Sequence, residues 1–406
     1  MELFITKCLI LITGRSLTLS SEKYIVETTK QLIRLQGINP PGHEAETANY
    51  LGQLMSQIGM EVQVCQLEPD RANVIGRIKG TGGGPKLMLN GHLDVVPPGE
   101  LDRWRHPPFE PHVERGQLFG RGSCDMKGGI SAILAAVKSI VDNKTQLKGD
   151  LLVTFVADEE SLGKGVNDIV ERGYSADMAV IGEPTRLQVV TAHKGLIWVE
   201  LTTFGKSAHA STVKSNDRGD TVNAIYKMCK AISATENYLP VLEKVRHKLV
   251  GNPTISVGEI SGGTKPNVVP DNCRATIERR TMPSERSDQV IQEIRKLFDS
   301  IGMSDKDFKY DLRIVNIRDG AEISENEKIV RFCRNSVKEV TGIDPGITGF
   351  VATSDMATLV NRAKIPTVLL GPGDLAQAHT ANEFVSINEL ILAARIYEHL
   401  IMTALR

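Results

Sequence analysis

The chain has 406 residues, and at roughly 150 residues per domain this length predicts two domains or three. Its 48 Lys and Arg residues nearly balance its 49 Asp and Glu residues, so the formal net charge of −1 gives no indication of a nucleic-acid-binding surface. With 41% hydrophobic and 24% charged residues, the composition is typical of soluble globular proteins. It excludes a disordered chain, a collagen-like chain and a multi-span membrane protein.

The N-terminal segment is apolar from Leu3 to Ile12, but it has no basic region before the apolar run and no small-residue cleavage site. We therefore do not expect a signal peptide, and we treat residues 1–19 as an N-terminal extension of uncertain role. The six cysteines are scattered without a C-x-x-C pair, which favours reduced thiols in a cytoplasmic protein over disulfides or a cysteine-based zinc site.

Helix and strand patterns alternate from about residue 20. Apolar residues at helical spacing predict helices at 20–35, 44–58 and 127–141. Short apolar runs predict strands at 62–65, 73–78, 86–89, 151–157, 178–181 and 366–370. Uninterrupted runs of this length are typical of strands that are covered on both faces. The alternation predicts an α/β domain in which helices sandwich a central mixed sheet.

The segment from residue 194 to residue 312 has a different pattern. Its predicted strands are 196–204, 253–259, 272–279 and 309–315, and its predicted helices are 220–234 and 287–298. This β-α-β-β-α-β order is typical of a ferredoxin-like α+β domain. We therefore predict that 194–312 is inserted into a larger domain made of 20–193 and 313–406, which ends with a helix at 388–403.

Polar side chains follow the apolar strands of the larger domain. These residues are His92 and Asp94 after 86–89, Glu159 and Glu160 after 151–157, Glu183 after 178–181, and His379 after 366–370, while Asp125 begins the helix at 127–141. Because ligands of open α/β sheets bind beyond the carboxyl ends of the strands, we expect these side chains to lie close together.

Two histidines and three carboxylates at one place would repel or take up protons unless cations balance them. Imidazole and carboxylate ligands suit Zn²⁺, Co²⁺ or Mn²⁺, and five ligands can hold two ions when one carboxylate bridges them. One residue of the Glu159–Glu160 pair can bind metal while the other serves as a general base. Asp94 is placed to receive the second ring N–H of His92. His43, His106, His112, His193, His247 and His399 lack this setting, and we treat them as ordinary residues.

The chain resembles the di-zinc metallopeptidase and amidohydrolase family of acetylornithine deacetylase, succinyl-diaminopimelate desuccinylase, aminoacylase and glutamate carboxypeptidase. The resemblance covers residue 20 to the end. It rests on the runs His92-Leu93-Asp94-Val95-Val96-Pro97, Gly120-Arg121-Gly122, Asp125-Met126-Lys127-Gly128-Gly129, Asp158-Glu159-Glu160, Gly182-Glu183-Pro184 and Ala378-His379-Thr380. It implies a zinc-aminopeptidase-like catalytic domain, with 194–312 as a lid that also forms a homodimer.

The same resemblance implies a role for each candidate residue. Its metal ligands are His92 and Glu183 for one ion, Glu160 and His379 for the other, and Asp125 as the bridge, with Zn²⁺ as the expected metal. Glu159 is then the general base, and Asp94 orients His92. In the lid, His209 reaches the active site of the neighbouring subunit. Asn267, Arg280 and the loop with Ser354 contact the substrate, although Glu278 stands where the family usually has Asp.

The implied activity is hydrolysis of the amide bond of a small N-acylated amino acid or related amine, with no nucleic-acid or membrane partner. Three alternatives stay open. The chain could be a carboxypeptidase or dipeptidase of the same family, a formylaminopyrimidine deformylase, or a non-catalytic metal-binding module.

Overall fold

The computed structural model describes residues 19–213 and 221–406, which form two compact units. The first unit comprises the described residues up to 189 together with 326–346 and 365–406, and the second lies within 190–325 and 347–364. Short strands flank the core of the second unit, and for this reason it extends beyond residues 194–312 at both ends.

The first unit is built on a mixed sheet with the strand order β1-β2-β6-β3-β7-β15. β1, β2 and β6 pair in antiparallel fashion, whereas β6, β3, β7 and β15 pair in parallel. Every residue of the four parallel strands is buried, so both faces of this part are covered, as the apolar runs predict. The strands are β1 (Glu61–Glu68), β2 (Arg71–Ile78), β3 (Leu87–His92), β6 (Leu151–Val156), β7 (Met178–Ile181) and β15 (Thr367–Leu369).

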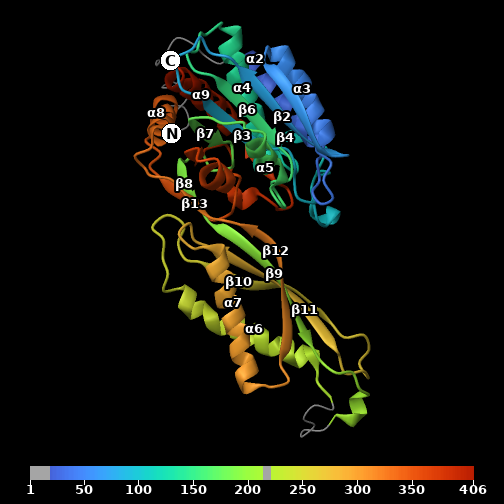
Figure 1. The fold of residues 1–406 in the computed structure, drawn as a ribbon. Coiled ribbons are helices and arrows are strands. Elements are labelled where there is room, and N and C mark those ends of the chain that lie inside the picture. The colour runs from blue at the N-terminus through green and yellow to red at the C-terminus, as the bar shows by residue number, and fades with distance from the viewer. Residues whose placement is uncertain (1–18, 214–220) are drawn as a thin grey trace. The chain divides into compact units, whose positions relative to one another are not determined.

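Helices pack against this sheet and against one another. α3 contacts β1 and β2, α8 contacts β7 and β15, and α4 contacts β3, α2 and α9 (Figure 1). α5 and α8 were not predicted, although the buried Ile329, Cys333 and Val337 of α8 recur every four residues and could have indicated it. The helices are α2 (Leu19–Arg34), α3 (Ala45–Ile58), α4 (Gly128–Asp142), α5 (Lys164–Glu171), α8 (Lys328–Thr341) and α9 (Ile387–Ala404), with short turns η1 (Leu101–Arg103), η2 (Ser123–Lys127) and η5 (Leu375–Gln377).

A small antiparallel sheet of the first unit, in the order β16-β5-β4, was missed by the sequence prediction. Each strand has three residues, which is too short to show an alternating pattern. The strands are β4 (His112–Glu114), β5 (Gln117–Phe119) and β16 (Phe384–Ser386). β16 begins directly after Glu383. The small sheet is therefore joined through β16 to the segment that carries His379.

The second unit has the predicted β-α-β-β-α-β order. Its sheet runs β10-β11-β9-β12 with all pairs antiparallel, which confirms the ferredoxin-like arrangement. The helix predicted at 220–234 begins later, because Asn223 caps it, and continues through Pro240. The elements are β9 (Gly195–Phe204), α6 (Ala224–Leu242), β10 (Thr254–Gly262), β11 (Asn272–Thr281), α7 (Ser287–Ser304) and β12 (Lys309–Arg318), with η3 (Ala210–Thr212), η4 (Thr358–Arg362), β8 (Val190–His193), β13 (Ala321–Glu322) and β14 (Thr348–Phe350).

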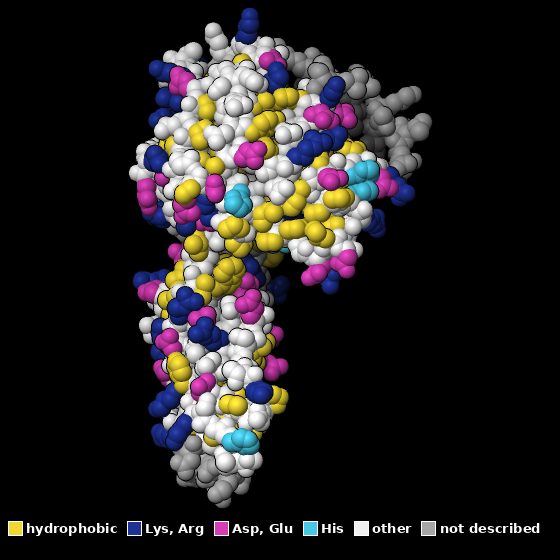
Figure 2. Space-filling view, turned by 90° about the vertical axis from the view of Figure 1, so that its right-hand side faces the viewer, with side chains coloured by type: hydrophobic (Ala, Val, Ile, Leu, Met, Phe, Trp, Pro, Cys, Tyr) yellow, Lys and Arg dark blue, Asp and Glu magenta, His cyan; other side chains and the backbone are white. Residues whose placement is uncertain are grey.

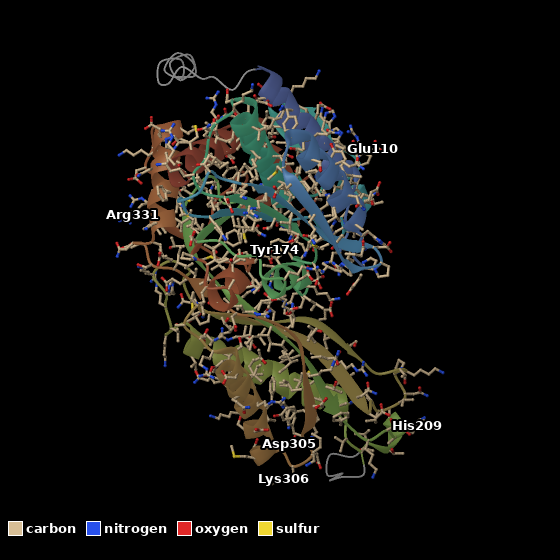
Figure 3. All side chains as sticks on the ribbon, turned by 45° about the horizontal axis from the view of Figure 1, so that its top comes forward. Glu110, Tyr174, His209, Asp305, Lys306 and Arg331 are labelled. Carbon is tan, nitrogen blue, oxygen red and sulfur yellow. The ribbon has the colours of Figure 1, made fainter. Side chains whose placement is uncertain are left out.

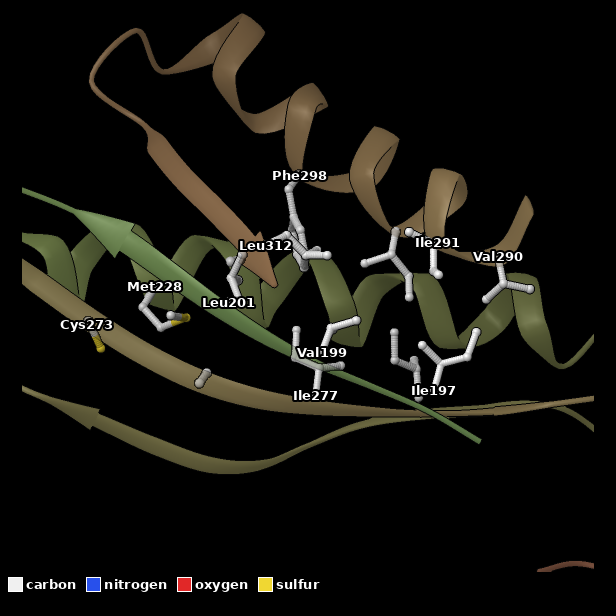
Figure 4. Packing of buried hydrophobic residues seen from close by; sticks show 14 of the residues in the cluster. Ile197, Val199, Leu201, Met228, Cys273, Ile277, Val290, Ile291, Phe298 and Leu312 are labelled. Atoms are coloured by element: carbon white, nitrogen blue, oxygen red, sulfur yellow. The ribbon is translucent and has the colours of Figure 1, made fainter. Parts of the chain in front are cut away.

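Alternate residues of β9 and β11 build the core of this unit. The buried residues include Ile197, Val199 and Leu201 of β9 and Ile277 of β11. Figure 4 shows these side chains on the side of the sheet that faces the two helices, where Phe298 of α7 also lies. The residues between them are more exposed, which is the period of two expected for a sheet with one covered face.

The surface agrees with the near-neutral charge of the chain, because acidic and basic side chains are mixed on the face that Figure 2 shows. No helix among the described residues combines the length and the apolar character that a membrane span needs. The cysteines at positions 65, 124, 229, 273 and 333 are free thiols. Residues 1–18 lie outside the described residues, so the expectation that no signal peptide is present stays a prediction.

Candidate metal centre

The five predicted ligands come from separate segments of the first unit. His92 is the last residue of β3, which runs three residues beyond the predicted strand because His92 still pairs with Val156 of β6. Asp125 lies in the irregular turn η2 rather than at the start of a helix, since α4 begins at Gly128. Glu160, Glu183 and His379 follow β6, β7 and η5.

Asp125 stands between the two histidines. Its Oδ1 lies 2.9 Å from His92 Nε2, and its Oδ2 lies 3.5 Å from His379 Nε2. His379 Nε2 is also 3.1 Å from Glu160 Oε1, and His92 Nε2 is 3.9 Å from Glu183 Oε1. Each oxygen of Asp125 therefore lies beside a different histidine. A carboxylate that bridges two metal ions needs its two oxygens placed in this way.

Burial and crowded charge shift the pKa values of these groups. Burial and the charge of Asp125 raise the pKa of Glu160 to about 7 and that of Glu183 well above its ordinary value. Burial lowers the pKa of His92, but the hydrogen bond to Asp125 and the charge of Glu183 outweigh it and raise the value. Glu160 and Glu183 thus lack enough compensating positive charge from the protein, and divalent cations would supply it.

The ring of His92 is held by the segment that follows it. Nδ1 lies 2.9 Å from the backbone carbonyl oxygen of Asp94 and 3.7 Å from its carboxylate Oδ1. The expected carboxylate contact is therefore replaced by a backbone hydrogen bond. When Nδ1–H donates to that carbonyl, the neutral ring carries its lone pair on Nε2, on the side of Asp125, and this is the tautomer that binds metal.

The Asp94 carboxylate instead holds the loop of the two glutamates. Its oxygens accept the backbone N–H groups of Glu159 at 3.1 Å and Glu160 at 3.0 Å, and also the side-chain amide of Asn39 at 2.8 Å. The first two contacts fix where the Glu159–Glu160 backbone lies, and the third holds the Asp94 carboxylate in place. Asn39 was not among the predicted site residues.

Behind this loop lies a buried ion-pair network built on Arg71. Its Nε donates to Glu44 Oε2 at 2.9 Å, and its Nη1 lies 2.9 Å from Asp158 Oδ1. The same Asp158 oxygen accepts the Asn39 amide at 3.1 Å. Asp158 has a φ of 67°, a left-handed conformation that costs energy for a residue other than glycine and needs such support.

The carboxylate of Glu383 holds the backbone around Asp125 in place. Its carboxylate accepts the backbone N–H groups of Gly122, Cys124 and Asp125 at 3.0, 2.9 and 3.1 Å. The buried Arg121 guanidinium donates to Glu383 from Nη1 at 2.6 Å and so balances its charge. Glu383 closes the turn that presents the bridging carboxylate, a role that sequence reasoning missed.

The remaining predicted residues belong to the second unit. Arg280 donates to Glu278 Oε1 at 2.8 Å and to Thr353 Oγ1 at 3.3 Å, which brings it beside the loop with the buried Ser354. His209 is exposed, as Figure 3 shows, and its Nδ1 accepts the backbone N–H of Ser211 at 3.3 Å. The carbonyl oxygen of Asn267 accepts the backbone N–H of Ala210, next to His209, at 3.0 Å.

The donor set of the first unit fits two divalent ions. Each histidine has a carboxylate partner besides Asp125, and imidazole with carboxylate suits Zn²⁺, Co²⁺ or Mn²⁺. The residues that would hold the ions are His92, Asp125, Glu160, Glu183 and His379. Glu159 lies in the same loop as Glu160, and its charge contributes to the raised pKa of His92 and of Glu183.

A comparison with protein families agrees with this geometry. The profile of peptidase family M20/M25/M40 matches residues 88–403. The chain belongs to this family. The family resemblance predicted from the sequence is thereby confirmed, and the M20 fold accounts for the mixed sheet and its helices.

Relatives of this M20 protein cover nearly its whole length. N-formyl-4-amino-5-aminomethyl-2-methylpyrimidine deformylase of Bacillus subtilis is 29% identical over 92% of either chain. A probable succinyl-diaminopimelate desuccinylase of Staphylococcus epidermidis is 28% identical over 91% of this chain and 95% of the relative. Among solved structures, an M20 family metallo-carboxypeptidase from Sulfolobus solfataricus has a TM-score of 0.79 at 21% identity and covers 93% of this chain and 98% of its own. A dinuclear metal binding peptidase of the family from Bacillus subtilis has a TM-score of 0.68 at 17% identity, covering 95% and 99%.

Proposed function

We propose that this M20 protein hydrolyses the amide bond of a small N-acylated amine or amino acid with the help of two divalent metal ions, most simply Zn²⁺. The observation that carries the proposal is Asp125 between His92 and His379, with one further carboxylate beside each histidine. The names of the deformylase and desuccinylase relatives support deacylation over peptide cleavage.

In this proposal His92 and Glu183 would hold one ion, Glu160 and His379 would hold the other, and Asp125 would serve both. The bound ions would lower the pKa of water and polarise the scissile carbonyl. Glu159 takes a proton from the attacking water and later gives that proton to the leaving amine nitrogen as the C–N bond breaks. The products are the free carboxylic acid and the amine, so one water is consumed for each bond cleaved.

The second unit supplies the remaining roles in the proposal. Through homodimerisation His209 serves the active site of a second copy of the chain, where its Nε2–H donates to the oxygen of the reacting carbonyl. This is consistent with Nδ1 accepting the Ser211 N–H, which leaves the ring proton on Nε2. The carboxylate or acyl group of the substrate is contacted by Arg280, Asn267 and Ser354. The pairing of Arg280 with Glu278 adjusts the strength of the arginine contact.

A substrate panel tests the proposal. Purified protein supplied with Zn²⁺, Co²⁺ or Mn²⁺ is assayed on N-formyl, N-acetyl and N-succinyl amines and on unmodified dipeptides. We expect hydrolysis of at least one N-acyl amine, faster than of any dipeptide, and loss of activity with a chelator. Turnover of dipeptides alone would favour a peptidase, and no turnover with metal bound would favour the binding module.

The base is tested in the same assay with Glu159→Gln, which keeps the shape of the side chain. Removing a general base costs roughly 10²–10⁴-fold in rate, and we expect such a fall in kcat while the bound metal stays unchanged. Glu110→Gln, at an exposed glutamate of the same unit, is the matched control and should keep full activity. Near-normal turnover by Glu159→Gln would contradict the role of this residue.

A further inference from the structure

Three donors of the first unit form a second cluster that shares no residue with the candidate centre. One ligand atom from each of His106, His112 and Glu114 lies within 4.8 Å of the others. Two imidazoles and one carboxylate form a common protein ligand set for zinc, and a water can complete the tetrahedron. We propose that these three residues bind a divalent transition-metal ion, with Zn²⁺ the best match, at a peripheral site.

The hairpin of β4 and β5 places two of these donors on one face. Its turn residues Arg115 and Gly116 both have positive φ, 49° and 77°, as a two-residue hairpin turn requires, and Glu114 pairs with Gln117. Side chains two residues apart on a strand point to the same side. His112 and Glu114 therefore project together, and the tight turn leaves them little freedom to separate.

The third donor reaches this face from the loop before the hairpin. The ring of His106 stacks on that of His112, with centroids 3.9 Å apart and planes 23° from parallel. The ring centroid of His106 also lies 6.3 Å from that of Phe119, the residue that pairs with His112 across the hairpin. This packing keeps His106 beside the strand. Because His112 is exposed, its ring can turn to aim a nitrogen at an ion shared with His106.

The neighbouring charge does not block the site. Arg115 Nε lies 3.6 Å from Glu114 Oε1, but the arginine side chain is 89% exposed. An exposed ion pair of this kind contributes little free energy, so an ion held by two imidazoles can displace the guanidinium from the carboxylate.

An ion at this site would tighten a loop that touches the segment of His379. The N–H of Arg105, next to His106, donates to Asn382 Oδ1 at 2.7 Å, and Asn382 Nδ2 donates to the carbonyl oxygen of Arg103 at 3.0 Å. Asn382 is three residues beyond His379 in the chain. Metal binding at the peripheral site should therefore raise the thermal stability of the first unit.

Metal counting tests the site on the full-length protein. Wild type, His106→Gln, His112→Gln and Glu114→Gln are dialysed against a buffer with micromolar free Zn²⁺, and zinc and protein are measured by mass spectrometry and absorbance. We expect each histidine variant to hold one zinc equivalent fewer than wild type, and Glu114→Gln to bind that equivalent more weakly. Added Zn²⁺ should raise the melting temperature more for wild type than for the histidine variants.

His43→Gln is the matched control, because His43 is also exposed and lies 4.0 Å from a carboxylate oxygen of Asp70. It should hold as much zinc as wild type. A Glu160→Gln and His379→Gln double variant should still lose one equivalent when His112→Gln is added, which separates this site from the proposed catalytic one. Equal zinc content in wild type and both peripheral histidine variants would overturn the proposal.

Discussion

Replacement of Arg71 by methionine should destabilise the first unit strongly. Arg71 is 5% exposed and contacts both Glu44 and Asp158, which are themselves buried. Methionine fills much of the same volume but leaves two carboxylates without their cation. Removing one partner of a buried ion pair costs about 3–5 kcal/mol, a large part of the roughly 5–15 kcal/mol that stabilises a typical domain.

The same strand offers a matched control. Arg77 of β2 donates to Asp150 at 2.6 Å, but its side chain is 44% exposed, and surface pairs of this kind contribute about 0–1 kcal/mol. Arg71→Met should therefore lower the urea midpoint, followed by circular dichroism, far more than Arg77→Met. Arg71→Lys should recover part of the loss, because it keeps the charge but not the paired guanidinium contacts.

Arg71→Met should also lower the catalytic rate. Asp158 precedes Glu159, and without Arg71 its left-handed backbone loses support, so kcat of the folded variant should fall below that of Arg77→Met. If both arginine variants unfold at the same urea concentration and turn over equally, the inference that Arg71 holds the glutamate loop is wrong.

Three further changes test the packing of α4, the turn of Asp125 and the pH dependence of stability. Gly129→Ala would place a Cβ 2.2 Å from the carbonyl oxygen of Gly182, so α4 must shift; we expect a loss of about 1–3 kcal/mol in urea unfolding. Glu383→Gln removes the charge opposite Arg121 and loosens the turn of Asp125. The zinc affinity of this variant, measured by chelator competition, should therefore fall. The control Glu110→Gln should keep the wild-type zinc affinity. Burial lowers the pKa of His193 from 6.5 to about 4. Between these values the unfolded chain binds the proton more readily, so stability falls as the pH drops through this window, and His193→Gln should flatten that pH dependence of the unfolding free energy.

Much of the fold follows from local patterns. The apolar runs of β3, β6, β7 and β15 carry their own signal, because a strand buried on both faces needs an uninterrupted run. The ferredoxin-like order follows from the period of two in β9 and β11 and the helical spacing in α7. The three-residue strands β4, β5 and β16 could not be found in this way, since pairing between distant segments creates them.

The same distinction between local patterns and contacts of distant segments holds for the candidate site. Three of the five proposed ligands were predictable in position, because His92 ends β3 and because Glu160 and Glu183 follow the ends of β6 and β7, where position in the sequence fixes position in the sheet. Asp125 and His379 instead lie in or after the short turns η2 and η5. The residues that hold the ligands in place were not predictable. Asn39 lies 55 residues from Asp94, and Arg121 lies 262 residues from Glu383, so only the folded chain shows these contacts. For Glu383, its place four residues after His379 in a polar run was the available signal.

In the proposed function, Asp125 would lie between two bound metal ions. A crystal of the zinc-loaded protein, measured with X-rays on both sides of the zinc absorption edge, tests it directly. We expect two anomalous peaks roughly 3.5–4 Å apart, one beside His92 and Glu183 and one beside Glu160 and His379. A single peak at these residues, or none while zinc is bound elsewhere on the chain, would contradict it.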